Sequence, residues 1–252
     1  MERIDRLMVD KGIVVSRTQA QRLILAGKVQ VSFLGQVESP RKYSQKYPES
    51  TDIDVAWEEG DRFVSRGGLK LAGALDECGL DIHGFTVLDV GQSTGGFTDC
   101  SLQRGASRVI GVDVGHNQLA SALRGDSRVV CLEGINARQL PVSLLQSYAD
   151  HQGFDLIVMD VSFISQTLIL PSLISLMKCG GYLLSLVKPQ FEVGLSGLGK
   201  GGLVKDESKY PKVEKKVRDA CLEHGLRVQQ FFDSPIRGGD GNREFFIIST
   251  RQ

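Results

Sequence analysis

From residue 87 onward, short runs of apolar and mostly β-branched residues recur along the chain, and several end in a charged residue. Five of these runs predict buried strands, and they are Val87–Asp89, Ser107–Asp113, Val129–Leu132, Phe154–Asp160 and Tyr182–Val187. Strands that are apolar along their whole length are typical of parallel sheets, because helices cover such sheets on both faces. The pattern therefore predicts an α/β fold with a doubly wound sheet.

The segments around these runs have helix-like patterns, which the alternation of a doubly wound sheet requires. The predicted helices are Asp99–Arg104, Asn117–Leu123, Leu140–Tyr148, Thr167–Met177 and Tyr210–His224. Two later apolar runs, Arg227–Phe232 and Glu244–Thr250, have no helix between them and predict an antiparallel hairpin at one edge of the sheet. A chain of 252 residues with 41% hydrophobic content can form one full-sized core and a small additional domain.

A loop rich in glycine and hydroxyl side chains follows the first predicted strand, in the segment VLDVGQSTGGFTD. It lacks both the Gly-Lys-Ser/Thr end of a P-loop and the G-x-G-x-x-G turn that binds a dinucleotide pyrophosphate. Small residues after a carboxylate favour a cofactor with a cationic, phosphate-free end, such as the methionyl part of S-adenosylmethionine. A tight turn without a ligand and a degenerate dinucleotide loop are the alternatives. The predicted contacts are Asp89, Gly91, Ser93, Thr94, Gly95, Gly96 and Phe97.

Polar residues at later strand ends extend this predicted cofactor site. Asp113 ends a strand about twenty residues beyond the loop, where α/β nucleotide folds place a carboxylate on the ribose hydroxyls. The alternative is that Asp113 only caps the next helix. We predict further cofactor contacts at Val114, Asn136 and Asp160, and Lys188 follows the fifth strand. Ligands of open parallel sheets lie beyond the carboxyl ends of the strands, so we expect these side chains at one site.

Charge is distributed unevenly, although the whole chain has 30 basic and 30 acidic residues. Residues 1–46 contain nine Lys or Arg and four Asp or Glu, whereas residues 49–61 contain six acidic residues and no basic one. A basic patch indicates a partner that is a polyanion, with a solvated helix face as the alternative. We therefore expect a basic N-terminal domain with an acidic linker, residues 1–60, followed by the α/β domain, residues 61–252.

The basic segment has the order of two short helices followed by a strand, with Ser16 as a suitable N-cap of the second helix and Gly27 as its stop. This arrangement resembles the S-four-type RNA-binding domain, a small α+β module of a ribosomal protein, pseudouridine synthases and tyrosyl-tRNA synthetases. The resemblance implies that Arg17, Arg22 and Lys28 contact RNA phosphates. We predict further RNA contacts at Arg3, Arg6, Arg66, Lys200 and Lys205. The last two belong to the glycine-rich segment Gln190–Lys205, which either becomes ordered on RNA or is an ordinary surface loop.

Joined together, the segments VSRGGLKL, DVGQSTGGFTD, GVDVG, MDVSFIS, LVKPQFE and SPIRGGDGNREFF resemble the TlyA family over nearly the whole chain. Members of this family are ribosomal RNA 2′-O-methyltransferases with an FtsJ-like catalytic domain, which has the Rossmann-like sheet of class I methyltransferases. The resemblance implies S-adenosylmethionine as the cofactor and a ribosomal subunit as the partner. We expect the target to be 16S rRNA and the protein to be a cytoplasmic monomer. A departure from the family is Gln92, where Ala is more common.

FtsJ-like enzymes use a Lys-Asp-Lys-Glu quartet, and the matching residues here are Lys70, Asp160, Lys188 and Glu244. A ribose 2′-hydroxyl is a very weak acid, so methyl transfer to it needs a base or a cation that stabilises the developing alkoxide. The resemblance implies that Lys188 lies nearest the hydroxyl, as a base if neutral or as an electrostatic stabiliser if charged. Lys70 and Asp160 would orient it, and Glu244 would hold Lys70 or the ribose.

Several other classes of protein are disfavoured. The five cysteines are scattered and the four histidines have no ligand spacing, so we expect neither a disulfide framework nor a metal site. The N-terminus has no apolar signal region, and polar residues interrupt the longest apolar stretch, so we expect no membrane span. TlyA-like proteins have also been labelled haemolysins, so a pore-forming protein is one alternative function. A non-catalytic RNA-binding ribosome-assembly factor is another, but the intact quartet favours an enzyme.

Overall fold

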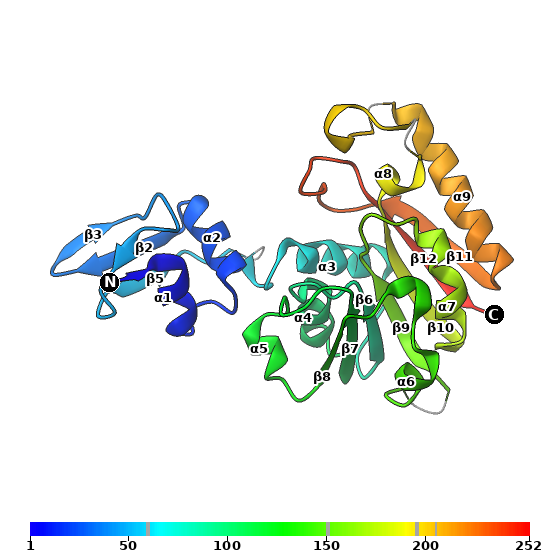
Figure 1. Ribbon diagram of the computed structural model, residues 1–252, viewed down its shortest axis with the longest axis horizontal. Coiled ribbons are helices and arrows are strands. Elements are labelled where there is room, and N and C mark those ends of the chain that lie inside the picture. Colours follow the sequence, from blue (N-terminus) through cyan, green and yellow to red (C-terminus); the bar gives the residue numbers. More distant parts are fainter. Residues whose placement is uncertain (59–60, 150–151, 195–196, 205) are drawn as a thin grey trace.

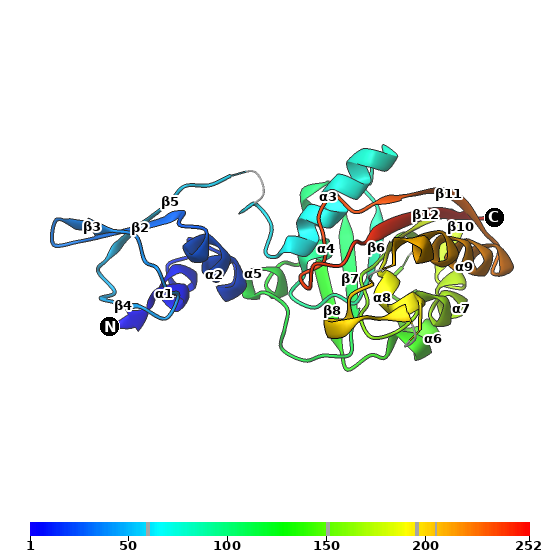
Figure 2. The ribbon, with the colours of Figure 1, turned by 90° about the horizontal axis from the view of Figure 1, so that it is seen from above.

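The computed structural model describes residues 1–58, 61–149, 152–194, 197–204 and 206–252. A small N-terminal domain lies beside a larger α/β domain, as Figure 1 shows with the long axis horizontal and Figure 2 shows from above. Each domain has its own buried apolar core. The predicted α/β class with a doubly wound sheet is confirmed.

The N-terminal domain places two helices against a small antiparallel sheet. The helices are α1 (Ile4–Asp10) and α2 (Arg17–Leu25), and the sheet contains β2 (Val29–Phe33), β3 (Gln36–Glu38) and β5 (Asp52–Val55), while β1 (Glu2–Arg3) pairs with β4 (Lys46–Tyr47). Apolar residues three and four positions apart give each helix one buried face, with Ile4 and Met8 on α1 and Leu23 on α2. The predicted cap is confirmed, since Ser16 Oγ accepts a hydrogen bond from the backbone N–H of Gln19 at 3.1 Å. The short strands β3, β4 and β5 went unpredicted, because their mostly exposed residues carry no apolar period.

The α/β domain contains a seven-stranded sheet in the order β11-β12-β10-β9-β6-β7-β8. The strands are β6 (Thr86–Val90), β7 (Arg108–Asp113), β8 (Val129–Glu133), β9 (Phe154–Met159), β10 (Met177–Val187), β11 (Leu226–Asp233) and β12 (Phe245–Arg251). β6 to β10 are parallel to one another, as the five apolar runs predicted. β12 is antiparallel to both β10 and β11, so the predicted hairpin at one edge is confirmed.

Helices cover both faces of this sheet. On one face lie α3 (Arg66–Cys78), α4 (Gly96–Gln103) and α5 (Ser121–Arg124), and on the other lie α6 (Val142–Gln146), α7 (Leu170–Ile174) and α9 (Tyr210–Glu223). Neighbouring residues of a strand face opposite sides, so Val87 packs in the cluster with α3 and α4 while Leu88 packs in the cluster with α7 and α9. Apolar side chains of the helices bury both faces of the sheet, which explains why the strand sequences are continuously apolar.

Two predicted helices need correction, and one helix was not predicted. The predicted helix Asn117–Leu123 is wrong before Ser121, where α5 begins. The predicted helix Thr167–Met177 is wrong beyond Ile174, because α7 is short and Met177 is already the first residue of β10. The helix α3 went unpredicted, because its first turn, Arg66–Gly68, contains two glycines, which have low helix propensity. Its later residues nevertheless form an amphipathic pattern that ends at Gly79, which has the left-handed conformation of a helix C-terminus.

Candidate active site

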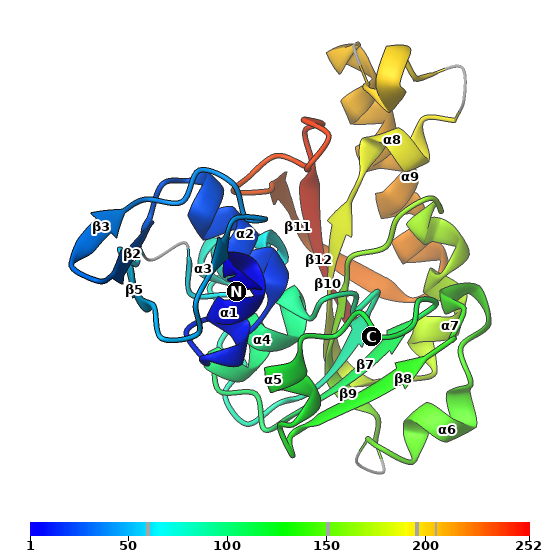
Figure 3. The same cartoon turned by 60° about the vertical axis from the view of Figure 1, so that its left-hand side comes forward.

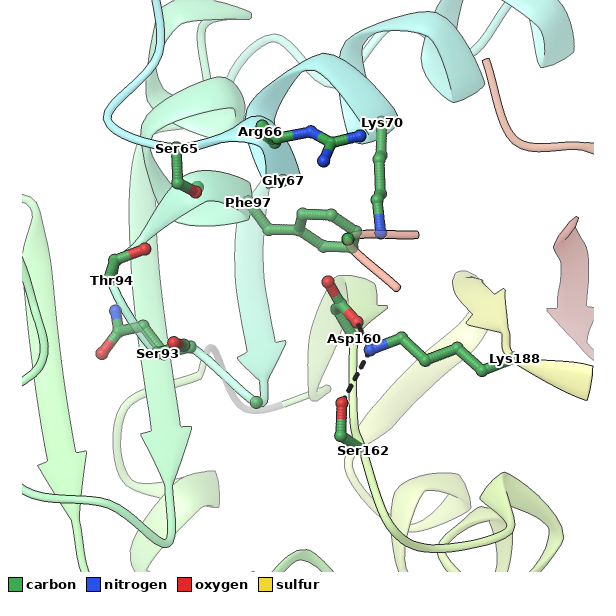
Figure 4. A pocket seen from close by; sticks show the side chains of 14 residues that line it. Ser65, Arg66, Gly67, Lys70, Ser93, Thr94, Phe97, Asp160, Ser162 and Lys188 are labelled. Carbon is green, nitrogen blue, oxygen red and sulfur yellow. Dashed lines mark hydrogen bonds and ion pairs between the residues drawn. The ribbon is translucent and has the colours of Figure 1, made fainter. Parts of the chain in front are cut away.

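The candidate site lies beyond the carboxyl ends of β6 and β9, at the point where the order of the strands reverses. From β6 the chain continues to β7 on one side of the sheet, whereas from β9 it continues to β10 on the other. Ligands of doubly wound sheets bind at such switch points. A pocket of about 280 Å³ lies here, shown in Figure 4. Of the predicted cofactor contacts, those that line the pocket are Gly91, Ser93, Thr94, Gly96, Phe97 and Asp160.

The glycine loop approaches the end of β9 closely. Gly91 has a φ of +88°, and a Cβ atom built on it would lie 2.4 Å from the carbonyl oxygen of Asp160. Any other residue would therefore force the two loops apart and would also strain the backbone. The start of α3 covers the loop from above, so that Ser65 and Gly67 complete the wall of the pocket.

Asp89 lies beneath the loop rather than in the pocket wall. Its side chain is fully buried and accepts a hydrogen bond of 2.7 Å from Thr98 Oγ1, which in turn accepts one from Gln92. Burial raises the pKa of Asp89 to about 7. Its Oδ1 atom has no hydrogen-bond partner among the described residues. Asp89 therefore supports the loop from below through Thr98, and the loop itself carries no Lys or Arg of the kind that a P-loop uses to bind phosphate.

The remaining predicted cofactor residues lie around this pocket rather than in its lining. Asp113 accepts hydrogen bonds of 2.7 Å from the backbone N–H groups of both Ser93 and Gly115, so it fixes the shape of the loop. Val114 is 69% exposed, and Asn136 caps a short helical turn by accepting from the N–H of Arg138. Gly95 packs behind the loop against Leu119 and Leu123.

The four residues of the predicted quartet form two lysine–carboxylate pairs at the edge of the pocket. Lys70 Nζ on α3 donates a hydrogen bond of 2.5 Å to Oε2 of Glu244, which immediately precedes β12. Lys188 Nζ, after β10, forms an ion pair of 2.6 Å with Oδ1 of Asp160 and donates a hydrogen bond of 2.8 Å to Ser162 Oγ. Figure 4 shows Lys188 and Lys70 approaching Asp160 from different elements. The fold thus brings together residues that are up to 174 positions apart.

The two pairs differ in their surroundings. The side chains of Lys70 and Glu244 are 9% and 3% exposed, and burial raises the pKa of Glu244 although the charge of Lys70 opposes this rise. Lys188 and Asp160 are more open, with side chains 12% and 22% exposed. Both pairs border the pocket, but the first is more deeply buried, while the carboxylate of the second is more open to the space where a reactant can enter.

A second pocket of about 720 Å³ adjoins the first on the side of Lys188. The two share Lys70, Ser162, Lys188 and Gly239, and the second is bounded further by Phe163, Gln190, Phe191, Asp240 and Glu244. The ring of Phe163 is 91% exposed and lies 5.3 Å, centroid to centroid, from that of Phe191. Lys188 therefore stands between a glycine-loop pocket and a larger pocket with aromatic walls.

Comparison with known proteins agrees with this geometry. The model of the FtsJ-like methyltransferase family matches residues 63–251, and that of the S4 domain matches residues 2–32. The chain belongs to the FtsJ-like methyltransferase family. The TlyA protein of Mycobacterium tuberculosis, named 16S/23S rRNA (cytidine-2′-O)-methyltransferase, is 39% identical over 97% of this chain and 88% of that protein. Hemolysin A of Brachyspira hyodysenteriae is 36% identical over 98% of this chain and 100% of that protein. A solved hemolysin-named structure from Streptococcus thermophilus has 39% identity and a TM-score of 0.74 over 100% of this chain and 88% of that one.

The basic residues predicted to contact RNA in the N-terminal domain of this methyltransferase are paired with acidic ones. Arg3 and Arg17 both bind the buried carboxylate of Asp5, with N–O distances of 3.0 Å. These bonds and one from Gln21 lower the pKa of Asp5, although burial of the carboxylate opposes this. Arg6 makes looser pairs with Glu2 and Asp10 along α1, at 3.8 and 3.7 Å.

Arg22 and Lys28 are paired with the linker. Lys28 Nζ lies 2.7 Å from Asp61 and 2.8 Å from Glu58, and Arg22 lies 3.6 Å from Asp61. Ser16, the N-cap of α2, also donates to the carbonyl of Val64, just before α3. The domain boundary expected at residue 60 falls on residues 59–60, which lie outside the described residues.

The remaining predicted RNA contacts belong to the catalytic domain. Arg66 lines the glycine-loop pocket and donates a hydrogen bond of 2.9 Å to the carbonyl of Arg237. Lys205 and the side chain of Lys200 lie outside the described residues.

Several residues that line the pockets went unpredicted, among them Ser65, Gly67, Ser162 and Gly239. Ser162 could have been found from its place two positions after Asp160 at a strand end. Ser65 and Gly67 carry no such signal, because α3 itself was not predicted.

Membrane-spanning helices and metal sites were both disfavoured by the sequence. Over the part of the chain that the structure describes, no helix is both long and apolar enough to cross a membrane. Within the same residues, no group of three or more His, Cys, Asp or Glu side chains could hold a metal ion.

Proposed function

We propose that this methyltransferase transfers the methyl group of S-adenosylmethionine to a ribose 2′-hydroxyl of ribosomal RNA. The observation that carries the proposal is the position of Lys188. Its Nζ is held by Asp160 and Ser162 between the glycine-loop pocket and the pocket with aromatic walls. One pocket supplies room for a methyl donor and the other supplies room for a nucleotide, so the amine lies where the two reactants would meet.

The glycine-loop pocket fits the donor. Gly91 lets the loop pack closely against the backbone of Asp160, so that the loop and the end of β9 form one wall of the pocket, and the buried side chain of Asp89 lies below it. Gly91, Ser93, Thr94, Gly96 and Phe97 would hold the cofactor, with Asp113 fixing the loop. When bound, S-adenosylmethionine supplies an electrophilic methyl group on a positively charged sulfur.

The residues of the chain would deprotonate the acceptor oxygen, stabilise its charge and align it for transfer. During methyl transfer, Lys188 Nζ would accept the proton of the 2′-hydroxyl, and the ammonium so formed would stabilise the negative charge that develops on the oxygen. Asp160, 2.6 Å from Nζ, would hold that ammonium in place. Ser162 and Asp160 restrict the orientation of the amine, and the buried Lys70–Glu244 pair fixes α3 and the turn before β12 on the opposite wall. Much of the rate gain comes from this alignment, which can contribute roughly 7 to 11 kcal/mol.

Ribosomal RNA as the substrate is supported by two features. The N-terminal domain is an S4 domain with many basic side chains, and the TlyA relative is named as an rRNA cytidine methyltransferase. We propose cytidine in 16S rRNA of the small subunit as the target, and residues 1–60 as the part that anchors the RNA.

The test is methyl transfer from radiolabelled S-adenosylmethionine to isolated 30S and 50S subunits of cells that lack the protein. Nucleoside analysis should recover 2′-O-methylcytidine from 16S rRNA. Label in 23S rRNA alone would correct the target, and label on a base would contradict the role of Lys188. Absence of transfer, with RNA binding retained, would indicate a non-catalytic assembly factor.

A further inference from the structure

The pocket with aromatic walls contains a buried amide that the reaction itself does not use. Gln190 lies in α8 (Pro189–Glu192), two positions after Lys188, and its residue is 7% exposed. It lines the pocket together with Lys188 and Asp240. Figure 3 shows that α8 and the turn before β12 project from the same end of the sheet.

The neighbouring carboxylate determines which way the amide of Gln190 points. Gln190 Nε2 donates to Oδ2 of Asp240 at 3.3 Å. Asp240 is itself held by two donors of Asn242, the backbone N–H at 3.1 Å and Nδ2 at 2.8 Å. Partial burial would raise the pKa of Asp240, but these hydrogen bonds and the nearby charge of Lys188 lower it below its usual value. An ionised carboxylate only accepts hydrogen bonds, so the NH₂ group must face it.

This orientation leaves the other end of the amide without a partner. Gln190 Oε1 is buried and has no hydrogen bond to any of the described residues. The pocket that Gln190 lines has apolar side chains in Phe163, Phe191 and Leu198 and donors that include Ser165 and Lys188, but none of the described donors bonds to this oxygen. A buried carbonyl oxygen without a donor is unfavourable, so the pocket has one unfilled requirement, which is an N–H group on the ligand.

We propose that Gln190 Oε1 selects cytidine by accepting a hydrogen bond from the N4 amino group of the target base. This inference rests on the proposed ribose methylation. Cytosine presents an amino donor where uracil presents the O4 acceptor. With uracil, O4 and Gln190 Oε1 would face each other as two acceptors, which is unfavourable. A nucleotide whose ribose lay at Lys188 would place its base in the rest of the same pocket, which Gln190 also lines. The residue is thus a specificity determinant, while Lys188 and Asp160 act on the ribose of any nucleotide.

The experiment compares C and U at one position. After the methylated position is mapped with the wild-type protein, ribosomal subunits are prepared that carry either C or U there. The wild type should favour C by about 10- to 100-fold in kcat/KM, the discrimination expected for a good base contact. Gln190→Met keeps the length of the side chain and removes the acceptor, and should reduce the preference to below about threefold by lowering activity on C.

Two further variants keep the test decisive. Gln190→Glu retains an oxygen acceptor and should retain the preference for C at a lower rate, because a second carboxylate then faces Asp240. Gln166 is a matched control, since it is also a buried glutamine with an unpartnered Nε2 but lies outside the lining of both pockets. Gln166→Met should leave the ratio unchanged. Melting and S-adenosylmethionine binding are measured for each variant.

The outcomes separate this inference from the proposed function. If the wild type transfers no methyl group to ribose, both the proposed function and the inference are wrong. If the wild type methylates C and U equally, or if Gln190→Met prefers C as strongly as the wild type, the inference alone is wrong.

Discussion

Lys70 Nζ and Glu244 Oε2 lie 2.5 Å apart, although 174 positions separate them in the chain. The contact joins α3, the first helix of the α/β domain, to the turn before its last strand. Each side chain is almost completely buried, so neither can lose its partner without leaving a charge in an apolar environment. The Lys188–Asp160 pair is different, because it joins the ends of two neighbouring parallel strands and remains partly open.

This difference predicts that replacing Lys188 mainly lowers the rate of methyl transfer, whereas replacing Lys70 also lowers the stability of the fold. Lys188→Ala should lower the rate of methyl transfer by about 10² to 10⁴ while leaving S-adenosylmethionine affinity and the melting temperature nearly unchanged. Lys188→Arg should be nearly as damaging, since a guanidinium is larger and does not release its proton. Lys70→Ala should also destabilise the fold by about 3 to 5 kcal/mol, because Glu244 would stay buried without its partner. Single-turnover kinetics and urea unfolding measure both effects. A fully active Lys188→Ala protein would show that the quartet is wrongly assigned.

The sequence predicted the pair at the strand ends more directly than the buried pair. Asp160 and Lys188 each follow an apolar run, and strand ends of one parallel sheet must meet at one edge. Lys70 and Glu244 were found only through their resemblance to a known quartet. Their contact depends on how α3 crosses the sheet and on where the hairpin β11–β12 places its turn, and these are properties of tertiary packing.

The buried carboxylate of Asp89 predicts a pH dependence of stability. Burial raises its pKa to about 7, against 3.8 for an ordinary aspartate. Between these two values the folded protein keeps a proton that the unfolded chain releases, so stability should fall as pH rises through this window. The contribution is on the order of 4 kcal/mol. Asp89→Asn, which cannot ionise, should show a smaller loss of stability between pH 5 and pH 8 in urea unfolding. The same pH dependence in both proteins would mean that Asp89 is ionised in the folded state.

Gln92 illustrates a feature that only the structure reveals. The sequence marked it as a departure from the family pattern, with no indication of where its side chain lies. In the structure it is 3% exposed, and it occupies the space beside Gly111 on β7. A Cβ atom on Gly111 would lie 2.0 Å from the amide of Gln92. The large residue in the loop is thus accommodated by a glycine in the neighbouring strand, a relation that no local pattern encodes.

This relation predicts that the two positions are coupled. Gly111→Ala alone should cost about 1 to 3 kcal/mol of stability and weaken cofactor binding, because it displaces Gln92 and with it the loop. Gln92→Ala should be milder, since it loses only its hydrogen bond to Thr98. The double variant should recover stability relative to Gly111→Ala, giving a favourable interaction energy in a double-mutant cycle. Additive effects would show that the space beside Gly111 is not limiting.

The charge pattern predicted a basic N-terminal domain but not its internal pairing. Arg17 and Lys28 are separated in sequence from Asp5 and Asp61, so their ion pairs could not be inferred from helix spacing.

These pairs predict unequal contributions to RNA binding. Arg6 is 62% exposed and loosely paired, so Arg6→Gln should lower the slope of log affinity against log salt by roughly 0.7 to 0.9. Lys28 must leave Asp61 and Glu58 to reach a phosphate, so Lys28→Gln should change the slope less. Fluorescence anisotropy with an rRNA fragment at several salt concentrations measures both slopes, and equal losses would mean that the pairs open on binding.

Phe163 predicts an aromatic contact with the RNA. It is 91% exposed, yet its φ of +64° places a bulky residue in the left-handed region, which is unfavourable by roughly 1 to 2 kcal/mol. The contact of this ring with Phe191 is its one aromatic contact among the described residues, and the exposed ring offers a surface on which a base can stack. Phe163→Ala should therefore lower kcat/KM for RNA methylation by about 10- to 100-fold, the effect of one lost stacking contact, with S-adenosylmethionine affinity unchanged. Phe163→Gly should have the same kinetic defect but a higher melting temperature, because glycine relieves the backbone strain. Leu168→Ala, which removes another exposed apolar side chain outside the lining of both pockets, should leave the kinetics unchanged. An unaltered kcat/KM in Phe163→Ala would show that the target base is held elsewhere.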